Sequence, residues 1–214
     1  MIDISRRFAV LGLAVGALGP LSAAAGPADL SPEDQRDIAQ AIKYIEGLAS
    51  EQSRFVQTDA RGGRSEGTFY LQRPGKARFD YDPPSGLSIA SDGHEVRVVD
   101  RRLKTIHAYP LGLTPLALFL ARDVRLDRGV AVAQVTHTAD GLTIVAEDAH
   151  KKTQGRIALT FSDAPFSLAG WTITDARGSA VTVRLAGLAR AEPRDASFFK
   201  LADPSARPRT EAAP

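Results

Sequence analysis

The chain has 214 residues, of which 43% are hydrophobic, enough for one domain with a substantial core. Its 27 basic and 25 acidic residues nearly cancel and lie scattered along the chain, which argues against a module that binds nucleic acid. It contains no cysteine, so we expect no disulfide, no thiolate metal site and no anchor through an acylated cysteine.

The first 25 residues predict a secretory signal peptide. A pair of arginines precedes an apolar run over residues 8–21, and small residues follow it. That run is shorter than the roughly 20 residues that cross a bilayer. We expect cleavage after Ala25, with Ala24 as the alternative, by either the Sec or the twin-arginine route. Without residues 1–25 the chain has 25 basic and 24 acidic residues, a net charge of +1.

A helix is predicted to begin at Pro32. Ser31 is a good N-terminal cap, proline suits the first helical position, and two acidic residues follow at the positive end of the helix dipole. Apolar residues then recur at helical spacing and form one stripe: Ile38, Ala41, Ile42, Ile45 and Leu48. One face of this helix should therefore pack on the rest of the domain.

From Ser53 onward the apolar residues alternate, which predicts an antiparallel meander whose strands are joined by turns such as Asp92-Gly93 and Asp140-Gly141. The predicted strands cover residues 53–57, 68–73, 76–81, 87–91, 96–99, 105–109, 130–137, 142–147, 156–161, 168–174 and 180–185. The chain should therefore form one mainly β domain.

Arg73 stands out in this pattern. If Phe69, Leu71 and Arg73 lie on one strand, all three point to the same face, and two of them mark that face as interior. A charged side chain is rarely buried without partners. Two alternatives follow for Arg73. It either lies at the rim of the sheet and reaches solvent, or it lies over an apolar concavity and binds a group on the other side of it.

Residues 110–122 interrupt the strands. Thr114-Pro115 predicts the start of a short helix, and residues 116–121 make it apolar nearly all round. Such a helix must be covered on every side. It is either a central core helix or a lid over an apolar cavity.

The sequence contains no convincing set of catalytic residues. Residues 63–67 match the Gly-x-Ser-x-Gly pattern of hydrolases around Ser65, but that pattern works only where a strand turns into a helix, and here it precedes a strand. The four histidines are far apart in sequence and no thiolate accompanies them. We expect no enzymatic activity, no metal and no cofactor.

Several short motifs occur together in one order. They are Arg54-Phe55-Val56-Gln57, the run 67–75 with Arg73-Pro74, Phe79 and Tyr81 before Pro83-Pro84, Ser91-Asp92-Gly93 with Val98 and Asp100, Thr114-Pro115-Leu116 through Ala121-Arg122, and Phe198-Phe199-Lys200-Leu201 before Pro204. With them the chain resembles the periplasmic outer-membrane lipoprotein carrier family, LolA. The resemblance covers a single domain over residues 26–202, and the stretch 203–214, rich in proline and alanine, predicts a disordered tail.

The resemblance implies an α+β, mainly β fold, in which an antiparallel sheet curls into an incomplete (half) β-barrel and helices form a lid over a hydrophobic cavity. By analogy with the family, Arg73 is the latch whose guanidinium binds carbonyls of the lid. The expected acyl-chain cavity and lid comprise Phe55, Phe69, Leu71, Phe79, Leu87, Ile89, Ile38, Ile42, Ile45, Leu116, Phe119 and Leu120. Family members often carry tryptophan in the sheet, whereas this chain has Tyr70 and Phe79 there and its single tryptophan is Trp171.

The function implied is that of a monomeric periplasmic carrier, which shields the acyl chains of lipoproteins and shuttles them from an inner-membrane ABC-type lipoprotein release complex to an outer-membrane acceptor. A second reading keeps the scaffold but makes it a lipid- or lipoprotein-sensing module of the cell envelope. A third, a small exported hydrolase, requires Ser65 for activity.

Overall fold

The computed structural model describes residues 30–114, 116–124, 130–148 and 155–205. The predicted signal peptide and the tail beyond residue 205 lie outside these ranges. Within them, no helix has both the length and the apolar character needed to cross a membrane.

The described chain contains two α-helices, two 3₁₀ turns and twelve strands. The helical elements are α1 (Pro32–Gly47), η2 (Leu111–Leu113), α2 (Leu116–Leu120) and η4 (Ala196–Phe199). The strands are β1 (Ser50–Thr58), β2 (Arg64–Gln72), β3 (Lys76–Tyr81), β4 (Leu87–Asp92), β5 (Glu95–Asp100), β6 (Thr105–Pro110), β7 (Val130–Thr138), β8 (Gly141–Asp148), β9 (Arg156–Asp163), β10 (Phe166–Thr174), β11 (Ala180–Leu185) and β12 (Ala189–Arg190).

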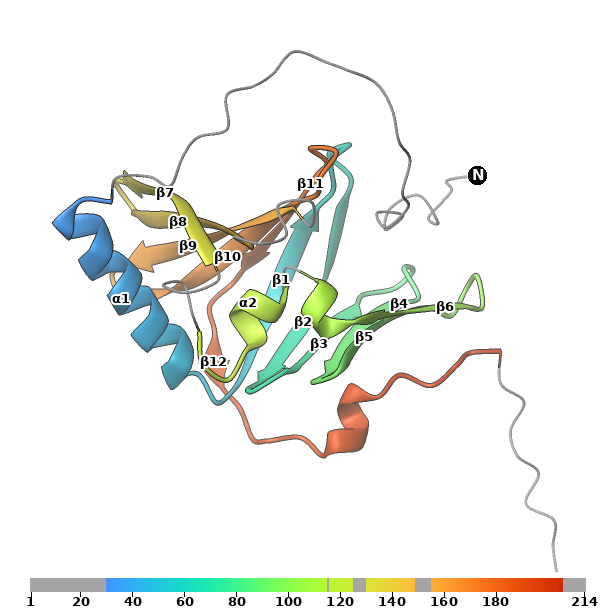
Figure 1. Ribbon diagram of the computed structural model, residues 1–214. Coiled ribbons are helices and arrows are strands. Elements are labelled where there is room, and N and C mark those ends of the chain that lie inside the picture. The colour runs from blue at the N-terminus through green and yellow to red at the C-terminus, as the bar shows by residue number, and fades with distance from the viewer. Residues whose placement is uncertain (1–29, 115, 125–129, 149–154, 206–214) are drawn as a thin grey trace, which may run out of the picture.

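The strands form one antiparallel sheet that does not close. Its order is β6-β5-β4-β3-β2-β1-β11-β10-β9-β8-β7, with β12 paired to β1. The two outer strands, β6 and β7, are not paired with each other. The sheet curls around α1 and α2, with α1 beside β7–β10 at the left of the view and α2 in front of β1 and β2 (Figure 1). The predicted half-barrel with helices over its concave face is confirmed.

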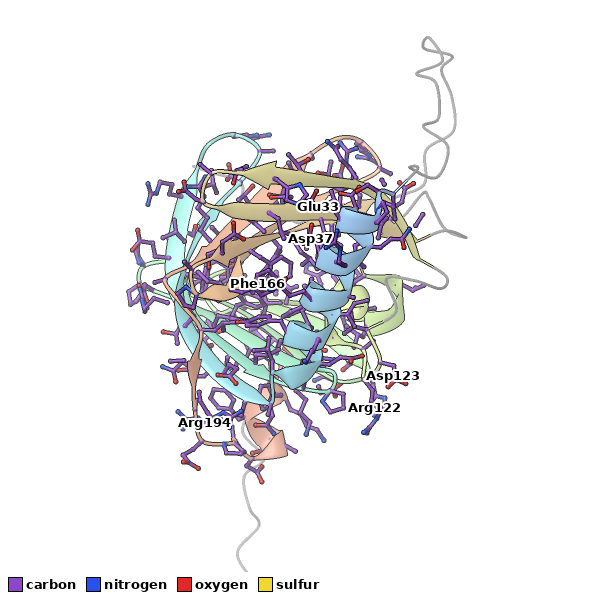
Figure 2. The ribbon with its side chains drawn as sticks, turned by 90° about the vertical axis from the view of Figure 1, so that its left-hand side faces the viewer. Glu33, Asp37, Arg122, Asp123, Phe166 and Arg194 are labelled. Atoms are coloured by element: carbon purple, nitrogen blue, oxygen red, sulfur yellow. The ribbon has the colours of Figure 1, made fainter. Side chains whose placement is uncertain are left out.

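The helix start at Pro32 is confirmed, because Ser31 and Asp34 form a complete capping box. The Asp34 N–H donates to Ser31 Oγ at 3.1 Å, and the Ser31 N–H donates to Asp34 Oδ2 at 2.9 Å. The apolar stripe of α1 faces the sheet, where Tyr44 meets the rings of Phe161 and Phe166 edge-on at 6.1 and 5.7 Å between ring centroids. Figure 2 shows Phe166 beside the middle of α1.

The alternation of side chains places the core on the concave face. In β2, Phe69 and Leu71 are buried and their neighbours are partly exposed, and in β3 Phe79 lies directly opposite Phe69. Gly67 is required beside them, because a Cβ at this position would lie 2.2 Å from the carbonyl oxygen of Asp80 and 2.8 Å from the Phe55 ring.

The convex face is covered by the C-terminal segment, which runs below β2–β5 in Figure 1. The Arg78 guanidinium lies 4.4 Å from the centroid of the Phe198 ring and donates to the carbonyl of the same residue. Arg97 donates to Leu201 O at 3.0 Å, and Leu201 packs with Ala90 and Val99 in a small second core. Neither η4 nor β12 follows from the strand pattern, so sequence analysis did not anticipate them.

Candidate functional site: the concave face and its lid

The centre of the concave face is a cluster of aromatic rings around Trp171. This side chain is 3% exposed. Its ring lies 5.4 Å from Phe69 and 6.0 Å from Phe79 between centroids, both at steep angles. The ring of Phe119, which comes from α2, stacks on Trp171 at 5.9 Å and 28°. The lid helix therefore inserts an aromatic ring into the interior of the half-barrel.

The lid segment, residues 111–114 and 116–124, buries apolar side chains against the sheet. Phe119 is 3% exposed, Leu120 is fully buried and Val124 is 2% exposed. Leu116 and Ala117 are partly buried against the same core. In this conformation, apolar surface of the sheet is therefore covered by apolar side chains of the lid.

Arg73 lies at the mouth, directly after β2, and its guanidinium joins both helices to the sheet. Nη1 donates to the carbonyl of Ile45 at the end of α1. Nη2 donates to the carbonyls of Ala121 and Arg122, the second at 3.1 Å. Figure 2 shows Arg122 close to the carboxyl end of α1. The side chain thus forms hydrogen bonds across the mouth, as the second alternative for Arg73 requires, and its role as a latch stays a prediction.

Electrostatics at Arg73 are set mainly by burial. Burial lowers the pKa of its guanidinium, and the nearby carboxylate of Glu46 opposes that effect. Arginine still stays charged at any physiological pH. Nε of Arg73 is buried and has no partner among the described residues. The carbonyls of Ile45 in α1 and of Ala121 and Arg122 directly after α2 therefore supply the polar contacts that compensate for partial burial of this charge.

Further hydrogen bonds attach the lid segment to its surroundings. The Gly75 N–H donates to Leu120 O at 2.8 Å. The Val124 N–H donates to Glu46 Oε1 at 3.2 Å, which ties the end of the segment to α1. At its start, the Leu111 N–H donates to His94 O at 2.8 Å. The lid is thus held at both ends.

The family model described as "Outer membrane lipoprotein carrier protein LolA" matches residues 46–202. The chain belongs to this family.

Curated relatives bear the same description. A protein of Methylococcus capsulatus named "Outer-membrane lipoprotein carrier protein" is 29% identical over 145 residues, which cover 66% of this chain and 69% of that protein. One of Cupriavidus taiwanensis with the same name is 27% identical over 183 residues, covering 77% and 83%. Among solved structures, a LolA superfamily protein from Nitrosomonas europaea aligns with a TM-score of 0.42 and 12% identity, over 76% of this chain and 97% of that one.

In this member of the LolA family, the twelve residues expected to form the cavity and lid belong to one apolar cluster. Nine are buried: Phe55, Phe69, Leu71, Phe79, Leu87, Ile38, Ile45, Phe119 and Leu120. Ile42, Ile89 and Leu116 are partly buried against them. The side chains pack on one another, and their contact with acyl chains stays a prediction.

Sequence analysis left other members of the cluster out of the site. Trp171 and Val124 are the most important, because one meets the lid and the other anchors its end. The alternation in 168–174 contained the signal for Trp171, since Leu168 and Trp171 are both buried on either side of a register shift in β10. That β-bulge breaks strict alternation, so period-two reasoning alone misplaces one of the two.

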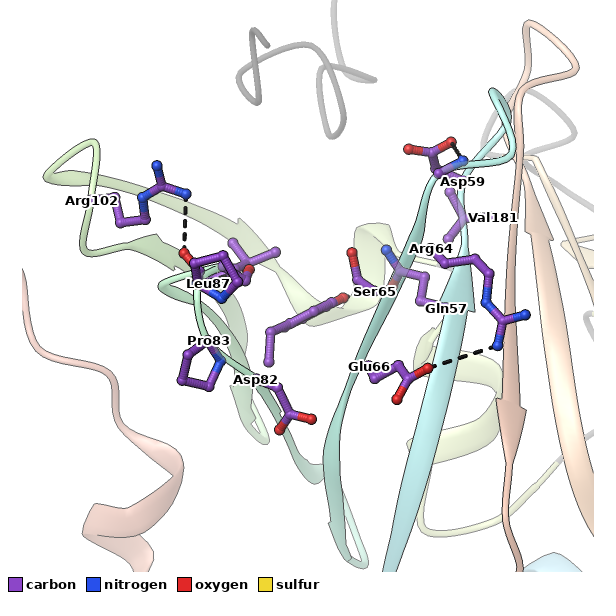
Figure 3. A pocket seen from close by; sticks show the side chains of 14 residues that line it. Gln57, Asp59, Arg64, Ser65, Glu66, Asp82, Pro83, Leu87, Arg102 and Val181 are labelled. Carbon is purple, nitrogen blue, oxygen red and sulfur yellow. Dashed lines mark hydrogen bonds and ion pairs between the residues drawn. The ribbon is translucent and has the colours of Figure 1, made fainter. Parts of the chain in front are cut away.

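A separate pocket of about 500 Å³ lies between the β1–β2 hairpin and the turn after β3 (Figure 3). Its walls are mostly polar or charged, with Ser65 and Arg64 on one side and Pro83 and Arg102 on the other. Ser65 lies within β2, not at a strand-to-helix turn, and no histidine lines the pocket. The context that the hydrolase pattern requires is therefore missing at this serine.

The described histidines do not gather. His94 and His107 are exposed, and His150 lies outside the described residues. His137, on β7, is exposed and contacts Asp37 of α1 with 2.7 Å between Nε2 and Oδ2. In the part of the chain that the structure describes, no three His, Cys, Asp or Glu side chains are placed to hold a metal ion.

The contact between His137 and Asp37 predicts a small dependence of stability on pH. The hydrogen bond to Asp37 raises the pKa of His137, with added attraction from Asp37, Glu33 and Asp34 and an opposing effect of desolvation. A raised pKa means that the protonated form stabilises the fold below the unfolded-state value near 6.5, and that this stabilisation is lost as the pH rises through the folded-state value. The thermal midpoint of the wild type, minus that of His137→Gln, should fall between pH 6 and pH 8.5.

Asp37→Asn provides the control for this measurement. In that background, the effect of His137→Gln on the midpoint should depend much less on pH, because the hydrogen-bonding carboxylate is gone and only the weaker attraction of Glu33 and Asp34 is left. An unchanged difference in the wild-type background would show that the pair contributes nothing to the attachment of α1.

Proposed function

We propose that this chain is a periplasmic carrier that shields the acyl chains of lipoproteins and takes them from an inner-membrane ABC-type release complex to an outer-membrane acceptor. The observation that carries the proposal is a lid whose own apolar side chains, led by Phe119, occupy the concave face of an open half-barrel. Membership of the lipoprotein carrier family supports it.

The energetics of acyl chains explain why a carrier is needed. Exposing a chain to water costs about 0.8 kcal/mol per methylene, so a lipoprotein with several long chains does not cross an aqueous compartment unaided. Transfer from a bilayer to an apolar interior is nearly neutral by the same accounting. The direction of transport must then come from the partners, with ATP hydrolysis by the release complex driving the loading step.

A filled interior makes loading reversible. When acyl chains enter, they take the place of Phe119, Leu120 and their neighbours on the sheet, so apolar contacts replace apolar contacts. When the chains leave, the lid covers the sheet again and Arg73 recovers its carbonyl partners. The empty carrier thus has a stable closed state that competes with cargo, which limits retention.

Binding can be tested with a synthetic tri-acylated lipopeptide and the same peptide without acyl chains. The single tryptophan, Trp171, is the reporter because it stacks on Phe119. The acylated peptide should change the Trp171 emission saturably and the unacylated peptide should not. Equal responses to both peptides, or none to either, would contradict the proposal.

The sensing module remains the second candidate, and a transfer assay separates the two. Carrier loaded with a fluorescent lipoprotein is mixed with vesicles that hold an outer-membrane acceptor. A carrier should deliver its cargo to these vesicles and not to vesicles without the acceptor. A sensor should retain the cargo in both cases.

A further inference from the structure

The two ends of the lid segment are held by the turns of two neighbouring hairpins. Residues 73–75 connect β2 to β3, and from this turn the Gly75 N–H donates to Leu120 O at 2.8 Å. Residues 93–94 connect β4 to β5, and from this turn the carbonyl of His94 accepts the N–H of Leu111 at 2.8 Å. One turn therefore holds the end of the lid and the other holds its start.

The two turns are in direct contact with each other. A Cβ built on Gly75 would lie 2.7 Å from Cα of Gly93, so the backbones approach too closely for a side chain between them. Both glycines have positive φ, +80° and +103°, a conformation that other residues rarely adopt. If the turn at Gly75 moves, the turn at Gly93 must therefore move with it.

The side chain of Ser91 joins the same two turns. Ser91 lies in β4 and is 2% exposed. Its Oγ donates to Gly75 O at 2.7 Å in one turn and accepts the N–H of Gly93 at 3.4 Å in the other. This hydroxyl therefore bonds to the holders of both lid ends, although it contacts neither the lid nor Arg73 by any hydrogen bond that the structure records.

We propose that Ser91 is a positioning residue that couples the two attachments of the lid, so that both ends are released together. The inference rests on the proposed carrier function, because it describes how that lid opens. Without the hydroxyl, Gly75 O loses a buried donor, and the turn can regain one only by moving. This turn carries the bonds of Arg73 and Gly75 to the end of the lid, and it lies against the turn at Gly93 and His94, which holds the start. The movement therefore weakens both ends at once.

Amide hydrogen exchange of the empty protein tests the coupling, because exchange reports local opening at each amide. In Ser91→Ala, the amides of Gly75 and Leu111 should both exchange about two- to tenfold faster than in the wild type, the range expected for one lost hydrogen bond. Amides in the middle of β8 and β9 should keep their rates. Ser91→Thr retains a hydroxyl and should restore slow exchange at both lid amides.

Ser88→Ala is the matched control. Ser88 lies on the same strand and is also 2% exposed, but its Oγ donates to Asp80 Oδ1 at 3.1 Å, on the opposite face of the sheet. This variant should leave the amides of Gly75 and Leu111 unchanged. Faster exchange of those two amides in Ser88→Ala as well would show that any loss of a buried hydroxyl on β4 has the same effect, and would overturn the proposal.

Two further outcomes of Ser91→Ala also overturn it. Faster exchange at Gly75 with no change at Leu111 would mean that the two attachments are independent. A uniform increase at all amides would mean a loss of global stability. The measurement needs no cargo, so it can fail while the tri-acylated lipopeptide still binds, and it can succeed even when the lipopeptide does not bind. Failure of this inference is therefore distinguishable from failure of the proposed function.

Discussion

Arg73→Leu should still load an acylated protein but should pass it on far more slowly than the wild type. In the empty closed state, the guanidinium donates to the carbonyls of Ile45, Ala121 and Arg122. Leucine cannot replace these bonds, so closing of the empty lid becomes less favourable. Because the loss of even one bond to a charged group removes about 1.5–3 kcal/mol, we expect release to slow by at least about tenfold.

Transfer from the loaded variant to acceptor-containing vesicles measures this effect. Arg78→Leu is the matched control, because Arg78 also donates to a main-chain carbonyl, that of Phe198, but on the convex face. It should transfer cargo at a rate close to the wild type after correction for stability. Equal transfer rates for Arg73→Leu and the wild type would rule out a latch at this position.

A lysine at position 73 sharpens the test. Its ammonium is a single compact charge, whereas the guanidinium donates through one nitrogen to Ile45 of α1 and through another to the residues directly after α2. Arg73→Lys should therefore give a transfer rate between those of the leucine variant and the wild type. A rate as low as that of leucine would show that both helices must be held at once.

Phe119→Ala should destabilise the empty protein and strengthen its binding of acyl chains. Phe119 is 3% exposed and stacks on Trp171, so its removal leaves a cavity and should cost about 3–5 kcal/mol of unfolding free energy. The same cavity leaves space under the closed lid that the ring of Phe119 occupies in the wild type. An acyl chain then enters without displacing a ring, and the lipopeptide should bind several-fold more tightly.

Phe199→Ala is the matched control for this change. Phe199 is 2% exposed and belongs to η4, away from the concave face. It should lose a comparable unfolding free energy, measured by urea denaturation, without tighter binding of the lipopeptide. If both variants bind the lipopeptide like the wild type, the ring of Phe119 does not compete with cargo and the site of the acyl chains lies elsewhere.

Much of the fold follows from local patterns in the sequence. The alternation of apolar residues predicted eleven of the strands, because a sheet with one buried face imposes period two on every strand. The capping residues around Ser31 predicted the start of α1 for a reason that acts within one helical turn. The anomaly at Arg73 indicated a position where a charge meets an apolar face, and the structure places it at the mouth.

Other features depend on contacts that no local pattern encodes. An apolar helix such as 116–120 must be covered, but its sequence does not say whether other side chains or a ligand cover it. The C-terminal segment binds the convex face through Arg78 and Arg97. The alternation correctly places both side chains on the outer face, but an outer position by itself suggests contact with solvent and not with another segment. The hydrogen bonds of Ser91 depend on the contact between the turns of two neighbouring hairpins, which no local pattern indicates.

The filled concave face also determines what the empty molecule presents to its environment. Among the described residues, the large apolar side chains that are well exposed are Leu103 and Leu113, 47% and 40% exposed. An unloaded carrier therefore offers little for a bilayer or a second copy to adhere to. Once cargo displaces the lid, the rings and leucines that it had hidden must lie against the cargo or at the surface. A loaded carrier would thus expose apolar surface that the empty carrier hides. A protein that receives the cargo could use this difference to distinguish the two states.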